Sequence, residues 1–112
     1  METEHLKRAL SIPQPFVELI LTGRKTAEYR SRYTHMRERV YLYASKIVND
    51  VEEYPYDRAL LLPRGVIVGS VDIVDCVNDE DRYAWVLKNP RRYKAPIIAK
   101  GTPQPGFWFP RF

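Results

Sequence analysis

Residues 65–76 read Gly-Val-Ile-Val-Gly-Ser-Val-Asp-Ile-Val-Asp-Cys, and the apolar positions of this run are almost all β-branched. Such a composition favours a buried β-strand over a helix. Gly69 within the run predicts a bend, a bulge or the close approach of another backbone. This is the strongest strand signal in the chain, and we expect the fold to be built around a sheet.

Shorter strands are predicted on both sides of this run. They cover residues 5–10, 26–32, 38–44, 83–87, 96–99 and 107–109, and we expect 26–32 to pair with 38–44. Residues 47–62 give a mixed pattern, for which a short helix broken at Pro55 is one interpretation.

A helix is predicted directly after the first strand. Ser11 and Gln14 have the Ser-x-x-Gln spacing of a capping box, with Pro13 in the first turn. The apolar residues 16, 17, 20 and 21 then share one face through Thr22, and Gly23 is placed to end the helix in the left-handed conformation. A helix this short and one-sided is expected to lie across an open end or face of the sheet.

Five or six short strands with one or two helices in 112 residues predict a mainly β (α+β) fold, a small curved sheet or barrel. We expect one domain, residues 1–112, because 45% of residues are hydrophobic and no linker divides the chain. The lone Cys76, the absence of a leader and apolar runs far short of ~20 residues predict a soluble, cytoplasmic protein away from membranes.

Charge is distributed unevenly along a chain whose net charge is +4. Residues 1–45 hold eight basic and five acidic side chains, residues 46–81 three and nine, and residues 82–112 seven and none. If the fold joins the two ends, they form one positive face suited to a phosphate backbone. A solvated surface with an accidental bias is the alternative.

Residues 23–32, Gly-Arg-Lys-Thr-Ala-Glu-Tyr-Arg-Ser-Arg, form the first candidate site. Strand alternation points Thr26, Glu28, Arg30 and Arg32 the same way, and Lys25 stands at the helix-to-strand corner. Such a set could bind an anion or form a ladder of surface ion pairs.

A second candidate joins Trp85 to the basic residues Lys88, Arg91, Arg92 and Lys94, since aromatic and basic side chains together can stack bases and neutralise phosphates. Alternatively, Trp85 fills the core. The aromatic and proline-rich tail, residues 102–112, is expected to be a strap packed on the body.

Familiar catalytic and cofactor motifs are missing from the sequence. There is no Cys-x-x-Cys, no histidine pair at metal-binding spacing, no phosphate-loop pattern and no dinucleotide glycine fingerprint. We expect no cofactor and no metal, and we expect Cys76 to be a small buried hydrophobic residue.

Several ordered blocks, spanning nearly the whole chain, resemble one family. The blocks are Ala9-Leu10-Ser11-Ile12-x-Gln14-Pro15, Gly23-x-Lys25-x-x-Glu28-x-Arg30-Ser31, Arg39-Val40-Tyr41-Leu42-Tyr43-Ala44-Ser45 and Gly65-x-Ile67-Val68-Gly69-x-Val71. They are similar to the ASCH domain, the activating-signal cointegrator homology domain. The resemblance implies an intracellular PUA-like β-barrel related to domains that bind modified RNA or DNA. The Leu-Ser-x-x-Gln-Pro opening is closest to the cointegrator branch, for which nucleic-acid binding is implied.

The resemblance also implies where a ligand binds. The family cleft maps onto Lys25, Glu28 and Arg30, with Gln14 and Ser45 as neighbours. Some bacterial members are amidohydrolases that deacetylate acetylcytidine, using a lysine, a threonine nucleophile three positions on and a glutamate. Glu28 stands where that threonine would be, so this activity does not carry over.

The leading hypothesis is therefore a monomeric nucleic-acid-binding module with a basic cleft. We expect RNA or a single-stranded or flipped-out nucleotide more than DNA duplex. The expected binding residues are Gln14, Lys25, Glu28, Arg30, Arg32, Ser45, Trp85, Arg91, Arg92, Lys94 and Lys100, with Tyr29 as a second stacking surface.

Two alternatives remain open at this point. One is a small hydrolase of amidohydrolase or ribonuclease type, acting on a modified nucleoside or RNA through Lys25, Glu28 and Tyr29. The other is a protein-interaction module that uses the aromatic residues 107–109 of the tail.

Overall fold

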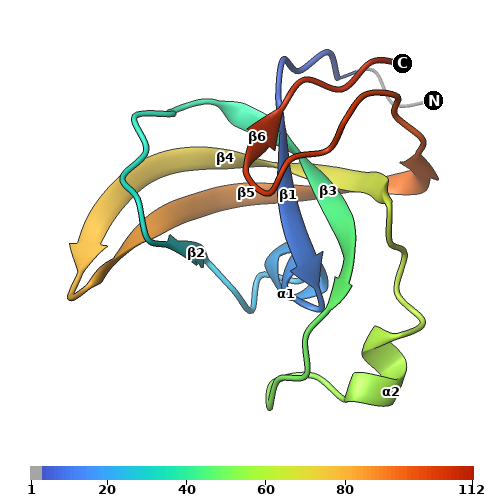
Figure 1. The fold of residues 1–112 in the computed structure, drawn as a ribbon, viewed down its shortest axis with the longest axis horizontal. Coiled ribbons are helices and arrows are strands. Elements are labelled where there is room, and N and C mark those ends of the chain that lie inside the picture. The colour runs from blue at the N-terminus through green and yellow to red at the C-terminus, as the bar shows by residue number, and fades with distance from the viewer. Residues whose placement is uncertain (1–3) are drawn as a thin grey trace.

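The computed structural model describes residues 4–112, which fold into six strands and two short helices. The strands are β1 (Ala9–Gln14), β2 (Ala27–Arg30), β3 (Arg39–Val48), β4 (Val66–Asp79), β5 (Arg82–Ile97) and β6 (Phe107–Trp108), and the helices are α1 (Phe16–Leu21) and α2 (Tyr56–Ala59). All six strands form one sheet in the order β2-β5-β4-β3-β1-β6. The sheet curls into a half-barrel, which confirms the predicted small PUA-like β-barrel (Figure 1).

Apolar side chains lie on both faces of the curled sheet. The larger core packs β1, β3, β4 and β5 around α1, whose Val17 and Ile20 are fully buried. Burying side chains of this size contributes about 1.5–3 kcal/mol each. On the other face Tyr41, Tyr43 and Trp108 form a second, aromatic core. No helix among residues 4–112 is long and apolar enough to cross a lipid bilayer.

The first strand and the start of the helix differ from the prediction. Residues Ser11 and Gln14 belong to β1, which pairs in parallel with β3, so the predicted capping box is wrong. Pairing of β1 with β3 engages the backbone N–H and C=O groups that a helix N-cap would have to bind. Pro15 occupies the cap position, and the Gln14 side chain instead accepts a hydrogen bond from the Glu18 N–H. Gly23, with φ +80°, ends the helix turn as predicted.

Strand pairing also corrects two predictions. β2 pairs with β5 and not with β3, because residues 31–38 form a long connection instead of a tight hairpin turn. The predicted strand 83–87 and the first two residues of the predicted strand 96–99 are parts of the single strand β5. Pro90 and Pro96 lie at shifts of the β4–β5 register, where a missing N–H costs no ladder hydrogen bond. Residues 56–59 form α2, which begins directly after Pro55.

The C-terminal tail is packed on the body, as the sequence predicts. β6 pairs with β1, and residue Trp108 is buried against the ring of Tyr43, with 5.0 Å between the ring centroids. The N–H of Ser11 donates to the carbonyl oxygen of Gly106, and Lys100 and Arg111 exchange two backbone hydrogen bonds. The tail therefore covers the aromatic core.

Gly69 lies where the backbone of β5 approaches most closely. A Cβ atom at this position would overlap the carbonyl oxygen of Arg91 and lie 2.9 Å from the Leu21 side chain. The register with β3 and the register with β5 both shift beside this residue. The close approach predicted from the sequence is confirmed, and it requires a residue without a side chain.

Replacing Gly69 with alanine should lower the free energy of unfolding by about 1–3 kcal/mol, because the methyl group forces the β4 and β5 backbones apart. Gly106→Ala is the matched control, since no atom lies within 4 Å of a Cβ there. The control should change stability by less than about 1 kcal/mol. Urea unfolding followed by tryptophan fluorescence measures both, and equal losses would contradict this account.

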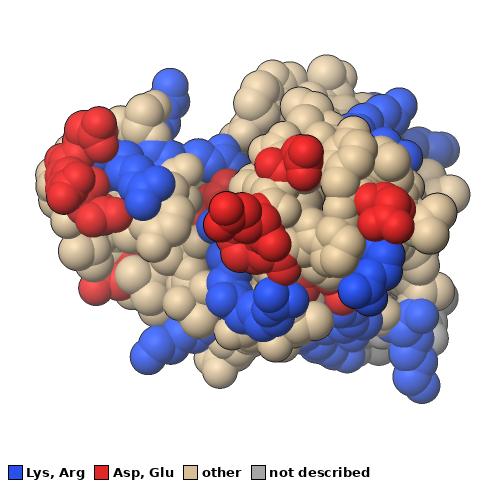
Figure 2. Space-filling model, turned by 90° about the horizontal axis from the view of Figure 1, so that it is seen from below, with Lys and Arg blue, Asp and Glu red and all other residues tan. Residues whose placement is uncertain are grey.

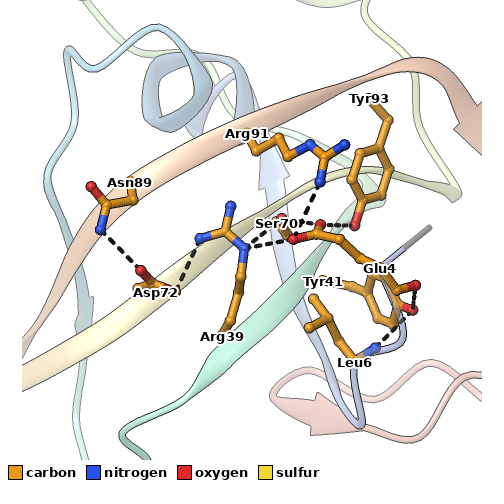
Figure 3. Close-up of polar contacts among 9 residues, drawn as sticks. All are labelled: Glu4, Leu6, Arg39, Tyr41, Ser70, Asp72, Asn89, Arg91 and Tyr93. Carbon is orange, nitrogen blue, oxygen red and sulfur yellow. Dashed lines mark hydrogen bonds and ion pairs between the residues drawn. The ribbon is translucent and has the colours of Figure 1, made fainter. Parts of the chain in front are cut away.

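The half-buried carboxylate of Glu4 fastens the segment before β1 to the sheet (Figure 3). Glu4 accepts hydrogen bonds from the hydroxyls of Ser70 and Tyr93, each 2.6 Å long, and from Nε of Arg39 at 2.9 Å. Nη1 of Arg91 lies 3.6 Å from the same carboxylate. One acidic side chain thus links the segment before β1 to β3, β4 and β5.

Polar contacts shift the pKa values of this cluster. Burial by itself raises the pKa of the Glu4 carboxyl, but the hydrogen bonds from Ser70, Tyr93 and Arg39 outweigh it, so the pKa lies below its usual 4.5. The hydrogen bond from Asn89 lowers the pKa of Asp72, and Arg39 adds to that effect. Burial and the bond to Glu4 raise the pKa of Tyr93.

A carboxyl whose folded-state pKa is lowered stabilises the fold above its unfolded pKa, and this contribution is lost as the pH falls through the folded value. The wild-type protein should therefore lose stability as the pH falls below about 4.5. Glu4→Gln should be less stable at pH 7 and lose less on acidification. Urea unfolding at pH 7, 5, 4 and 3 measures this, with exposed Glu52→Gln as the control; an unchanged slope in Glu4→Gln would show that Glu4 does not carry the effect.

Candidate functional site

A cleft of about 900 Å³ opens on the side of the half-barrel where β2 faces β1. This volume lies within the range of about 300–1,000 Å³ typical of small-molecule sites. Its lining comes from five strands or helices and from the tail, and is mostly apolar. The lining residues are Ser11, Pro13, Phe16, Lys25, Glu28, Tyr29, Arg30, Tyr43, Ser45, Lys46, Ile47, Asn49, Glu53, Arg82, Pro103, Gln104 and Pro105.

Glu28 is the buried charge of the cleft, with 6% of the residue exposed. One carboxylate oxygen lies 3.6 Å from Nζ of Lys25, and the other lies 2.9 Å from Nη2 of Arg30. Both oxygens therefore face a cation, and the three side chains together carry one net positive charge. A buried carboxylate needs such partners, because burial without them is costly.

Arg30 closes the open side of the half-barrel. Its Nη2 donates to the carbonyl oxygen of Ser11 on β1, and its Nη1 donates to that of Pro105 in the tail, each at 2.9 Å. Its Nε donates to Glu28 at 3.0 Å. These contacts make Arg30 a brace between β2, β1 and the tail.

Aromatic rings and cations alternate along one wall of the cleft. Nζ of Lys25 lies 5.0 Å from the ring centroid of Phe16 and 5.1 Å from that of Tyr29. The guanidinium carbon of Arg82 lies 3.8 Å from the Tyr29 ring centroid. Tyr29 is 42% exposed, so the wall offers a flat surface with positive charge beside it.

The structure brings five of the predicted residues together in the cleft, namely Lys25, Glu28, Tyr29, Arg30 and Ser45. Gln14 lies close by but is only 1% exposed, and its amide donates to the Pro63 carbonyl oxygen. Trp85 is 3% exposed and takes the core position that was its alternative interpretation. Its ring stacks on Phe107, and its indole N–H donates to the Arg32 carbonyl oxygen.

The remaining predicted residues are Arg32, Arg91, Arg92, Lys94 and Lys100, and they are not among the described residues that line the cleft. Arg92 makes a paired contact with Glu18, with oxygen distances of 2.9 and 2.7 Å. Burial works against the charged form of Arg92, but the hydrogen bonds to Glu18 outweigh it and its pKa is raised. Arg91 lies beside Glu4, and Lys94 lines a hollow near the same segment.

Sequence reasoning missed several residues of the cleft. Lys46 directly follows Ser45, so extending the predicted strand 38–44 by two residues would have found it. Ser11, Phe16 and Tyr43 were assigned only to the cap, the helix face or the family blocks. The tail residues 103–105 come from a distant part of the chain, and no local pattern signals their position.

The fold defines the class of protein, a small PUA-like β-barrel with a ligand-sized cleft beside a Gly-x-Lys-x-x-Glu-x-Arg segment. Residues 10–99 match the ASCH domain, and the chain belongs to that family. It is also similar to activating signal cointegrator 1 of Homo sapiens and of Mus musculus, with 25% identity over 126 residues in each case. That alignment covers 85% of this chain and 21% of either relative, so the chain spans about a fifth of their length.

Replacing Arg30 with lysine should loosen the tail while keeping the charge. Lysine cannot reproduce the fork that reaches two carbonyl oxygens and a carboxylate, so we expect a loss of about 1–3 kcal/mol in the free energy of unfolding. The backbone amides of Thr102, Gln104 and Gly106 should also exchange faster with deuterium. Arg32→Lys is the control, because Arg32 is exposed. If both variants behave alike in urea unfolding and hydrogen exchange, Arg30 is not the brace.

Proposed function

We propose that this protein binds nucleic acid and takes one unstacked nucleotide of a single strand into the cleft. RNA is the preferred form, since sequence-specific RNA recognition mostly uses unpaired bases placed against aromatic side chains. The observation that carries this proposal is the wall of the cleft, where the Lys25 ammonium lies between the rings of Phe16 and Tyr29.

Charge in the cleft fits a nucleotide. Four basic side chains line it, Lys25, Arg30, Lys46 and Arg82, against two acidic ones, Glu28 and Glu53. Apolar walls suit a base, and cations suit the phosphates that flank it. Figure 2 shows acidic and basic side chains interspersed on the face seen there, so the single positive face expected from the sequence is not visible on that side of residues 4–112. The proposal therefore rests on local charge in the cleft.

Basic residues outside the cleft extend the proposed binding surface. We propose that they contact the phosphates of a longer strand, and they are Arg32, Arg91, Arg92, Lys94 and Lys100.

We also propose a single domain over residues 1–112 that acts as a monomer in the cytoplasm. The buried, unpaired thiol of Cys76 fits a reducing compartment.

A hydrolase acting on a modified nucleoside or RNA is the second candidate. It rests on the separation of 3.6 Å between Nζ of Lys25 and Oε1 of Glu28, in a cleft that also holds Tyr29. A lysine so placed could stabilise negative charge that develops in a transition state, and a carboxylate could move a proton. Formation of a reaction product would distinguish this hydrolase from a protein that only binds its ligand.

Lys25→Ala should weaken binding of a labelled single-stranded RNA about 10–100-fold, the loss expected for one charge-assisted contact. Lys7→Ala, which removes an exposed charge outside the cleft, should bind as the wild type does. Fluorescence anisotropy with single-stranded RNA, single-stranded DNA and duplex DNA measures affinity. Its slope against salt in a log-log plot should be roughly −0.7 per neutralised phosphate.

Chromatography of the same mixtures, and of a panel of modified nucleosides, detects any product. Product that disappears in Lys25→Ala would favour the hydrolase. Equal binding by both lysine variants, or preference for duplex DNA, would contradict the proposed function.

A further inference from the structure

Two hydroxyl groups in the cleft are buried and have no hydrogen-bond partner. They are the Oγ atoms of Ser11 and Ser45, two of the three such side-chain atoms among residues 4–112. Both serines line the cleft, and the Ser11 residue is only 6% exposed. The third atom, Nε1 of Trp108, belongs to a residue that does not line the cleft.

The two serines come from neighbouring strands and line the same cleft. Ser11 of β1 stands opposite Tyr43 of β3, and Ser45 follows Tyr43 by two residues, where the β1–β3 register shifts. Tyr43 is therefore next to Ser11 across the strand pair and close to Ser45 along β3. Together the three side chains form what we call the cleft floor, Ser11, Tyr43 and Ser45.

Folding alone does not account for these hydroxyls. The N–H of Ser11 donates to Gly106 and its carbonyl oxygen accepts from Arg30, so only the side-chain oxygen is left without a partner. Buried polar atoms in proteins are nearly always hydrogen-bonded, and each exception needs an explanation such as an ion, a water or a ligand. Alanine would fill the same position without burying an unpaired oxygen. The hydroxyls therefore point to a partner that occupies the cleft.

The chemistry of the floor indicates which part of a ligand it meets. A serine hydroxyl is uncharged and can both donate and accept, which matches the mixed donors and acceptors on the edge of a nucleobase. Both carboxylate oxygens of Glu28 already face Lys25 and Arg30, so Glu28 has little capacity left to read a base. The cations that suit phosphates belong to β2, to the start of β5 and to Lys46, not to the floor.

We propose that the Ser11 and Ser45 hydroxyls of the cleft floor form hydrogen bonds with the edge of the nucleobase that enters the cleft. This inference rests on the proposed function, because it names the specificity-determining groups of the same site. The ligand class is an unstacked heterocycle that carries donors and acceptors on its edge, held by its phosphates at Lys25, Lys46 and Arg82.

The test compares two short single-stranded RNAs that differ at one nucleotide. One carries uracil and the other carries an apolar ring of the same shape, which stacks but cannot form hydrogen bonds. Wild-type protein should prefer the natural base about 3–10-fold, the size of one or two uncharged hydrogen bonds. Ser11→Ala and Ser45→Ala should each reduce this preference, and the double variant should bind both RNAs equally with an unchanged salt slope. Ser31→Ala, an exposed serine beside β2, is the matched control.

Thermal unfolding distinguishes a role of the two hydroxyls in base recognition from a role in stabilising the fold. The serine variants should be as stable as the wild type or more stable, because the lost hydroxyls have no partner in the free protein. A drop in melting temperature would show that the hydroxyls are structural and would overturn the inference. Equal preference for uracil in wild type and both serine variants would also overturn it, while a normal loss in Lys25→Ala would leave the proposed function standing. If no single strand binds at all, the proposed function itself fails.

Discussion

The guanidinium of Arg30 joins β2, which pairs with β5, to β1 and to the tail. β2 and β1 lie at opposite sides of the curled sheet, and the tail crosses between them. Planar Arg30 reaches the carbonyl oxygens of Ser11 and Pro105 while Glu28 holds it from its own strand. Because a guanidinium presents its N–H donors in a rigid planar fork, one side chain reaches all three acceptors, which a lysine ammonium could not do. The cleft exists because this contact brings its walls together.

Closure by a side chain, instead of by strand pairing, leaves a hollow that a fully paired barrel would fill. The walls of this hollow differ in the charge of their side chains. Three of the four cleft cations, Lys25, Arg30 and Arg82, lie beside or on β2 and at the start of β5, and the fourth, Lys46, follows Ser45 on β3, whereas the neutral hydroxyls of Ser11 and Ser45 belong to β1 and β3. Such a division suits a ligand that is charged along its backbone and neutral at its reading edge, which describes a nucleotide.

The sequence predicted what depends on local chemistry and missed what depends on pairing. The strand around Gly69, the turn at Gly23 and the association of Lys25, Glu28 and Arg30 follow from neighbouring residues, and all three appear in the structure. The predicted capping box at Ser11 is wrong because the backbone of this residue pairs in parallel with β3. That pairing is with a distant part of the chain, so the local sequence pattern does not reveal it. The sequence predicted two separate strands where the structure has the single strand β5. This strand continues past Pro90 and Pro96 because both lie at shifts of the β4–β5 register. No sequence pattern brings residues 103–105 to the cleft, since that contact spans most of the chain.

Two groups of polar side chains among residues 4–112 differ in whether their hydrogen-bonding groups find partners. Half-buried Glu4 accepts hydrogen bonds from donors on three strands, so these contacts stabilise the fold and leave little capacity for a ligand. Ser11 and Ser45 are buried with nothing to bond, a cost to stability that folding does not recover. Proteins carry such unfavourable groups mainly where function needs them, because a site that binds must keep some of its hydrogen bonds unmade until the ligand arrives. The contrast separates the stabilising contacts of Glu4 from the unpaired hydroxyls of the cleft beside Arg30, where we propose that the ligand binds.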